Sequence, residues 1–279
     1  MEDTVIKGIK VFGGESTSGG NLGKLNNEDV ELAMKYEALK LRVVERREQF
    51  FELIKWLEEE TEWTTSPASI KYHMNKPHGL LEHSVNVAET MLALKDTLAP
   101  DISDESCIIV GLLHDLGKAG MPGRPQYLEN EPSEKQKWAG YPATIPYKYN
   151  NELIYLSVPI RSLYLVLPRL TLTEEEVQAI AYHDGQYVDD NRSVAAKEEK
   201  LTLLLQYADN WSGFVKEMEK MSKIYVPTLG PDSWKPLLKR KIHWKTGRSA
   251  KSLAHSWEGA CEESNKKNLR MTWICILGG

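Results

Sequence analysis

The chain has 279 residues, of which 41% are hydrophobic and 27% charged, a composition that excludes collagen-like, mucin-like and wholly disordered proteins. Its net charge of −5 gives no general attraction to polyphosphates, so any contact with nucleic acid would need a local basic patch. Three cysteines without a CxxC spacing predict neither a disulfide framework nor a cysteine zinc site.

The first residues, MEDTVIKGIK, do not have the basic and apolar regions of a secretory leader. The longest apolar run, CIIVGLL at 107–113, is too short to span a bilayer. We therefore expect a cytosolic protein without a membrane partner. Residues 1–27 are rich in Gly and Ser and are expected to form a mobile arm that ends at a helix N-cap.

Apolar residues at helical spacing predict an all-α domain over residues 28–224. The expected helices are 28–62 (one long helix or two joined by a bend), 79–95, 103–116, 159–167, 173–183 and 201–221. Thr173 and Glu176 have the spacing of a capping box. No alternating strand pattern is apparent before residue 224.

Two segments differ in composition from the predicted helices. Residues 120–150 are rich in Pro, Gly, Tyr and Asn, as in a loop that shapes a site, and aromatic side chains within 126–151 could stack on a base. Residues 225–279 form a separate segment in which 235–251 contains seven Lys or Arg and no acid. That stretch is compatible with nucleic-acid binding, with a solvated basic face, or with the start of an incomplete module.

Four candidate metal ligands are found on or at the ends of the predicted helices: His83, His114, Asp115 and Asp209. His114 and Asp115 immediately precede a helix end at Gly117, where the backbone can turn both side chains inward. Asp115 there opposes the helix dipole, which favours a nearby cation. Imidazole and carboxylate ligands suit Mn, Mg, Zn, Fe, Co or Ni. Taken singly, however, His83 also fits a hydrogen-bonded core histidine, and Asp209 fits solvent or a polar pocket.

The combined pattern H…HD…D, with the doublet in HDLGK, resembles the HD-domain superfamily of metal-dependent phosphohydrolases, an all-α fold. The segments HGLLEHSVNVAETML and IVGLLHDLGKAG are similar to those of bacterial HD-domain 3′-to-5′ exoribonucleases and related nucleotide hydrolases, and the resemblance covers residues 70–220. It implies that His83, His114, Asp115 and Asp209 bind a divalent metal. It also implies that Lys118, otherwise a solvated lysine at a helix end, contacts substrate phosphate.

A second metal site is left open by the sequence. Two-metal members of the superfamily often carry HHG after the doublet, whereas this chain has His183, Asp184 and Gly185. Because a carboxylate can also bind a metal, Asp115, His183 and Asp184 could form that site. Otherwise His183 would donate a proton or contact phosphate beside a single metal.

Three further residues are predicted to bind substrate. Lys76 and His78 lie in a loop before the first ligand helix, which either meets substrate phosphates or is plain surface. Arg161 is an isolated cation in an apolar helix, which indicates either a buried ion pair or a phosphate clamp, and we predict the clamp.

The resemblance implies hydrolysis of a nucleotide phosphoester or phosphoanhydride by metal-activated water, with Asp115, Lys118 and His183 as catalytic residues. One alternative is a 3′-to-5′ exonuclease or other nuclease on single-stranded RNA or DNA, and a second is a non-catalytic metal-stabilised scaffold or ligand sensor. The acidic composition favours a small nucleotide, whereas the basic stretch 235–251 favours a polymer. Each of these hypotheses about function requires the side chains of the four candidate ligands to lie close enough together to bind one metal ion.

Overall fold

The computed structural model describes residues 5–6, 9–10, 27–72, 74–186 and 188–218. Most of the predicted arm and the whole segment 225–279 lie outside these residues. Within the arm, β1 (Val5–Ile6) and β2 (Ile9–Lys10) pair in antiparallel fashion. In the described ranges, no helix is both long and apolar enough to cross a membrane.

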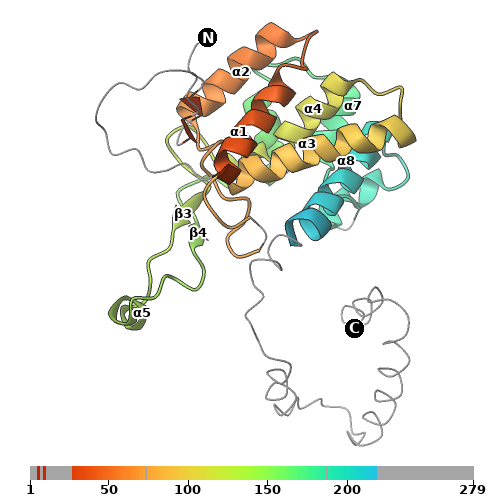
Figure 1. Cartoon of the computed structure of the whole chain (residues 1–279). Coiled ribbons are helices and arrows are strands. Elements are labelled where there is room, and N and C mark those ends of the chain that lie inside the picture. Colours follow the sequence, from red (N-terminus) through yellow and green to blue (C-terminus); the bar gives the residue numbers. More distant parts are fainter. Residues whose placement is uncertain (1–4, 7–8, 11–26, 73, 187, 219–279) are drawn as a thin grey trace, which may run out of the picture. The chain divides into compact units, whose positions relative to one another are not determined.

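The helical domain is all-α, as predicted, with α3 at its centre (Figure 1). Its larger helices are α1 (Asn27–Lys40), α2 (Arg47–Glu60), α3 (Gly79–Leu98), α4 (Asp104–Leu113), α6 (Val158–Val166), α7 (Glu174–Ala181) and α8 (Lys200–Trp211). Short 3₁₀ helices span Leu116–Ala119 and Asp189–Val194, and a π-helical turn at Ser212–Lys216 extends α8. Helix α3 packs against α1, α4 and α8, so side chains from all of these elements can meet along it.

The apolar stretch 28–62 forms two helices, and the break between them depends on a distant residue. The buried carboxylate of Glu105 accepts the backbone N–H groups of Val44, Glu45 and Arg46 at 2.8, 2.7 and 3.2 Å. These are the unsatisfied donors that precede α2, and the positive end of the helix dipole stabilises a carboxylate at a helix N-terminus. Glu105 therefore fixes a bend that contains neither proline nor glycine.

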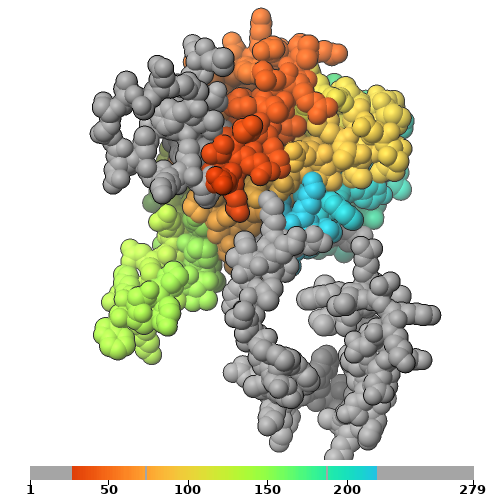
Figure 2. Space-filling view, in the orientation of Figure 1, coloured from red at the N-terminus to blue at the C-terminus, as the bar shows by residue number. Residues whose placement is uncertain are grey.

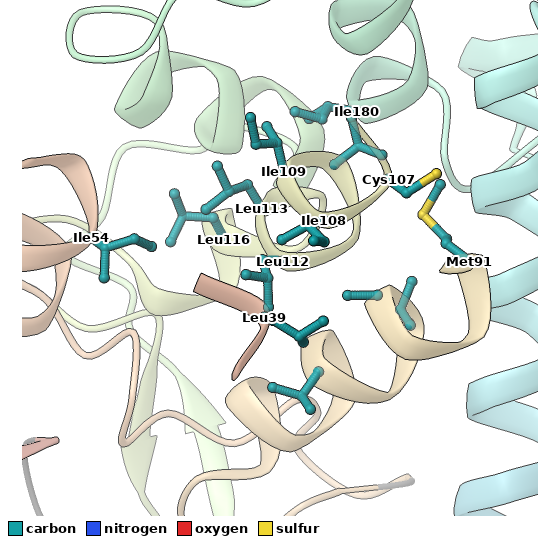
Figure 3. Close-up of a cluster of buried hydrophobic side chains, with 14 of the residues drawn as sticks. Leu39, Ile54, Met91, Cys107, Ile108, Ile109, Leu112, Leu113, Leu116 and Ile180 are labelled. Carbon is teal, nitrogen blue, oxygen red and sulfur yellow. The ribbon is translucent and has the colours of Figure 1, made fainter. Parts of the chain in front are cut away.

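The core surrounds α4, whose residues are buried on nearly every side (Figure 3). Side chains labelled in that view come from α1, α2, α3, α4, α7 and the 3₁₀ turn: Leu39, Ile54, Met91, Cys107, Ile108, Ile109, Leu112, Leu113, Leu116 and Ile180. Gly111 lets α4 approach α3 closely, because a Cβ there would lie 2.7 Å from the Cα of Ala88. This close packing holds together the helices that carry His83 and His114.

Two further short strands lie within the helical domain, where the sequence shows no alternating strand pattern. Strands β3 (Tyr127–Glu129) and β4 (Tyr147–Tyr149) pair in antiparallel fashion, with Tyr127 opposite Tyr149, and their connection carries the small helix α5 (Glu134–Ala139). Figure 2 shows this hairpin, in green, standing out from the helices. Strands of three residues are too short to display an alternating pattern. The hairpin occupies the segment that we expected to be a site-shaping loop.

Substituting Gly111→Ala tests the close approach of α3 and α4. Alanine normally stabilises a helix interior relative to glycine, but here the added methyl group must push two buried helices apart. We expect a loss of about 1–3 kcal/mol in the free energy of unfolding, measured by urea denaturation. An increase in stability would show that the two helices can separate freely at this point.

Candidate metal centre

The four predicted ligands converge from α3, α8 and the end of α4. His83 Nε2 lies 3.1 Å from Asp209 Oδ1 and 3.5 Å from Asp115 Oδ2. His114 Nε2 lies 3.6 Å from Asp115 Oδ2 and 4.0 Å from Asp209 Oδ1. The three residues His83, His114 and Asp115 are buried, and Asp209 is partly buried. The structure thus brings together side chains that are far apart in the sequence.

The His114–Asp115 doublet turns inward because α4 ends there. His114 keeps helical backbone angles, whereas Asp115, at φ −99° and ψ 7°, begins the 3₁₀ turn. Ser162 of α6 holds this turn: its Oγ accepts the N–H of Gly117 and donates to the carbonyl of His114, both at 2.8 Å. A Cβ at Gly117 would lie 2.3 Å from a backbone oxygen of α6, so the turn requires glycine.

The residues fit a divalent metal ion, and the strongest sign is an orphaned buried atom. His114 Nδ1 lies 2.9 Å from the carbonyl of Gly111 and must donate to it, which leaves the lone pair on Nε2. That buried Nε2 has no hydrogen-bond partner and faces the carboxylates. Metal ligands at about 2.0–2.2 Å from one ion lie roughly 3–3.5 Å apart, close to the separations observed here.

A third histidine adjoins this cluster. His183, just after α7, is buried, and its Nδ1 lies 2.9 Å from the carbonyl of Ile180. Its Nε2 lies 3.4 Å from Asp115 Oδ1 and 3.6 Å from Asp184 Oδ1. The two carboxylate oxygens of Asp115 therefore face different histidines, Oδ2 toward His83 and His114 and Oδ1 toward His183.

The histidines differ in charge because their partners differ. Burial alone would lower the pKa of His83, but hydrogen bonds to carboxylates raise it to about 10. The pKa of His183 is raised to about 9 against the effect of burial, chiefly by Asp115. Burial dominates at His114 and lowers its pKa to about 4, so this imidazole is neutral at pH 7. Two imidazolium groups thus balance the buried carboxylates, a role that a bound divalent cation would take over while displacing protons.

Comparison with known families agrees with this geometry. Residues 80–211 match the HD domain, and residues 227–272 match a domain of unknown function (DUF6946). Residues 80–211 are an HD domain. No curated protein and no solved structure matches the chain. HD domains belong to a superfamily of metal-dependent phosphohydrolases, and all four candidate ligands lie within the matched residues.

Glu217, beyond the HD match, was not singled out by the sequence. Its buried carboxylate lies 3.0 Å from His83 Nδ1 and accepts a hydrogen bond of 3.3 Å from the side-chain amide of Asn86. Because Nδ1 donates to this carboxylate, the Nε2 of His83 is directed toward Asp115 and Asp209. A carboxylate that accepts the N–H of a metal-binding histidine orients the imidazole ring and makes the other ring nitrogen more basic.

The π-helical turn explains why helical periodicity does not place Glu217 in the site. In a regular α-helix, a residue eight positions after Asp209 would be rotated by about 80° from it. Here the N–H of Glu217 bonds to the carbonyl of Ser212, five residues earlier, which widens one turn. Asp209 and Glu217 consequently approach opposite nitrogens of the same imidazole, that of His83.

Lys118 and Arg161 line a cavity of about 620 Å³ beside the metal centre, which we call the polar pocket. Asp115, Asp184, Tyr127 and Asn150 also line it. Lys118 Nζ donates to Asp115 Oδ2 at 2.5 Å. The pKa of Asp115 stays well below its usual value despite burial, chiefly because of the Lys118 ammonium. The predicted lysine and arginine therefore both adjoin the candidate ligands.

Arg161 does not form an ion pair with any described residue. Its guanidinium donates to the carbonyl of Gly117 at 3.2 Å, to Gln126 Oε1 at 2.5 Å and to the carbonyl of Ile154 at 3.1 Å. Its buried Nε has no hydrogen-bond partner, and burial lowers the pKa of the guanidinium. Arg161 thus ties the base of the hairpin to the turn that carries Lys118. Its predicted role as a phosphate clamp stays a prediction.

Lys76 and His78 lie at a different cavity, of about 500 Å³, which α1 and α3 border. Lys76 Nζ pairs with Glu82 at 2.7 Å, and His78 Nδ1 donates to the carbonyl of Thr64 at 2.6 Å. Neither residue lines the polar pocket. Their predicted contact with substrate therefore has no support from this arrangement and stays a prediction.

The role of Glu217 can be tested by metal binding alone. We expect Glu217→Ala to weaken Mn²⁺ affinity by about 10- to 100-fold in isothermal titration calorimetry, because His83 loses its orienting acceptor. Glu217→Gln keeps an acceptor oxygen, so its Mn²⁺ affinity should fall less than that of Glu217→Ala. Glu48→Ala, at an exposed position on α2, is the control and should bind as the wild type does. An unchanged Mn²⁺ affinity in Glu217→Ala would show that Glu217 does not orient His83 for metal binding.

Proposed function

We propose that this protein hydrolyses a phosphoester or phosphoanhydride bond of a nucleotide with the help of a divalent metal. The observation that carries the proposal is the cluster of buried His83, His114 and Asp115 with partly buried Asp209, which includes the orphaned His114 Nε2 and lies beside a pocket lined by Lys118 and Arg161. A metal held there would acidify a water molecule and stabilise negative charge on the phosphoryl oxygens. We propose the cytosol as its location.

Lys118 is suited to bind the substrate phosphate. Its ammonium is mostly buried, lines the polar pocket and stays protonated because the Asp115 carboxylate raises its pKa against the effect of burial. The Arg161 guanidinium adds positive charge at the same pocket without a carboxylate partner among the described residues. A phosphate that enters this pocket would meet both charges, which favours an anionic substrate.

The size of the polar pocket favours a small substrate. Its volume of about 620 Å³ lies in the range of small-molecule sites. Asn150 and Tyr127 supply polar groups that can hydrogen-bond a sugar or a phosphate oxygen. We therefore propose a mononucleotide or the terminal residue of a short single strand as the substrate.

Asp115 is proposed to serve two metal ions. Its Oδ2 faces His83 and His114, and its Oδ1 faces His183, which in turn lies 3.6 Å from Asp184. His183 also lies within 4.8 Å of ligand atoms of His114 and Asp209, so the two groups of ligands adjoin, as they would have to for Asp115 to bind both ions. His183 and Asp184 would hold the second ion, and Asp184 takes the place of the second histidine of the HHG pattern.

The hydrolase proposal is tested with Asp115→Asn, which keeps the size of the side chain but removes its charge. We expect metal-dependent phosphate release from a panel of nucleotides with Mn²⁺ to fall by about three orders of magnitude or more. Chelation of the metal should abolish the wild-type activity, and added Mn²⁺ should restore it. The exposed Asp190→Asn serves as the control, with full activity expected. Retention of more than a tenth of wild-type turnover by Asp115→Asn would refute the proposal.

Metal stoichiometry tests the second site. Elemental analysis after gel filtration in Mn²⁺ should give two ions per chain for the wild type and one for Asp184→Ala, because one of the two ions loses a ligand. Asp189→Ala, at an exposed position five residues further on, should keep two. A wild-type value of one would contradict the bridging arrangement and leave His183 as a proton donor.

A further inference from the structure

A second cavity adjoins the metal centre and shares Lys118, Tyr127 and Tyr149 with the polar pocket. Its volume is about 870 Å³. Three segments enclose it: the loop 68–72 before α3, the two hairpin tyrosines, and the extension of α8 with Gly213, Phe214 and Met218. We call this cavity the aromatic groove.

Large exposed apolar side chains from separate segments of the chain line the aromatic groove. The exposed fraction is 64% for Tyr72, 73% for Phe214 and 51% for Met218. The rings of Tyr127 and Tyr149 lie 5.6 Å apart, with 43° between their planes. A soluble protein seldom gathers exposed rings from separate segments at one cavity unless the cavity binds something. Their planar faces match a planar ligand.

The charge of the aromatic groove is opposite to that of the chain as a whole. The chain has a net charge of −5, yet the described residues that line the groove include two lysines, Lys71 and Lys118, and no Asp or Glu. Lys71 Nζ lies 5.0 Å from the centre of the Tyr72 ring. Lys118 also contacts Asp115 of the metal centre. An anionic group at Lys118 would therefore lie beside the candidate metal ligands, with the rest of its molecule in the groove.

We propose that the aromatic groove binds the unpaired base of the nucleotide whose phosphate lies at Lys118. The inference rests on the proposed function and adds a binding site for the base, to which the polar pocket has not been assigned. Tyr72 and Phe214 supply ring faces on which a base can stack, an interaction that every base can make. Both residues lie outside the HD match, so base binding would come from parts of the chain that the metal centre does not use.

Binding to three phosphates tests the groove independently of catalysis. The full-length protein is titrated calorimetrically with AMP, ribose 5-phosphate and hexyl phosphate in the presence of EDTA, which prevents metal-dependent hydrolysis during the titration. We expect AMP to bind most tightly, and Tyr72→Ala or Phe214→Ala to weaken AMP binding by about 5- to 150-fold. Affinity for ribose 5-phosphate, which has no base, should change little. Tyr164→Ala removes a ring of similar exposure, 61%, from α6, outside the groove, and should bind AMP as the wild type does.

The possible outcomes separate this proposal from the proposed hydrolase. Equal affinity of the wild type for AMP and ribose 5-phosphate would overturn the base site, as would equal effects of Tyr72→Ala and Tyr164→Ala. If hexyl phosphate binds as tightly as AMP, the groove is a site for aliphatic chains and the proposal is wrong. Metal-dependent phosphate release that persists alongside any of these results would leave the hydrolase intact. Groove-dependent AMP binding without any phosphate release would instead overturn the hydrolase and retain the base site.

Discussion

The carboxylate of Asp115 is buried in a helical core, and this imposes the main constraint on the fold. A carboxylate removed from water costs several kcal/mol unless cations and hydrogen-bond donors surround it. Here the surrounding groups are His83, His183 and Lys118, which come from α3, the segment after α7 and the 3₁₀ turn. The helices must therefore pack so that these side chains meet, and the glycine contacts of α4 and the turn permit that packing.

The sequence predicts the parts of this fold that depend on local physics. Helical periodicity locates the helices, and the Thr173 capping box forms as expected because it needs only residues three apart. The doublet is recognisable since it marks a helix end before glycine. The break between α1 and α2 is not predictable in this way, because it is made by Glu105, about sixty residues along the chain. The β3–β4 hairpin is not predicted because its three-residue strands are too short to show an alternating pattern of apolar and polar residues.

Within the site, too, the sequence predicts some residues, whereas others are brought together only by the tertiary fold. All four ligands of the predicted metal are brought together, whereas Lys76 and His78 lie at another cavity despite preceding α3 directly. Residues from the hairpin and from the end of α8 complete the surroundings of Lys118, and only the tertiary fold unites them. Lys118 consequently lines both the polar pocket and the aromatic groove and also contacts the metal centre through Asp115.

The wide turn at the end of α8 absorbs one residue of the interval between Asp209 and Glu217. Deleting one residue from 212–216 would restore a regular helix and shorten that interval to seven positions, which corresponds to a rotation of about 20° instead of about 80°. The Glu217 carboxylate would therefore still face His83. In this helix, the removal of one residue from the turn should be tolerated, whereas a substitution that closes the turn at its full length would rotate the Glu217 carboxylate away from His83 by about 100°.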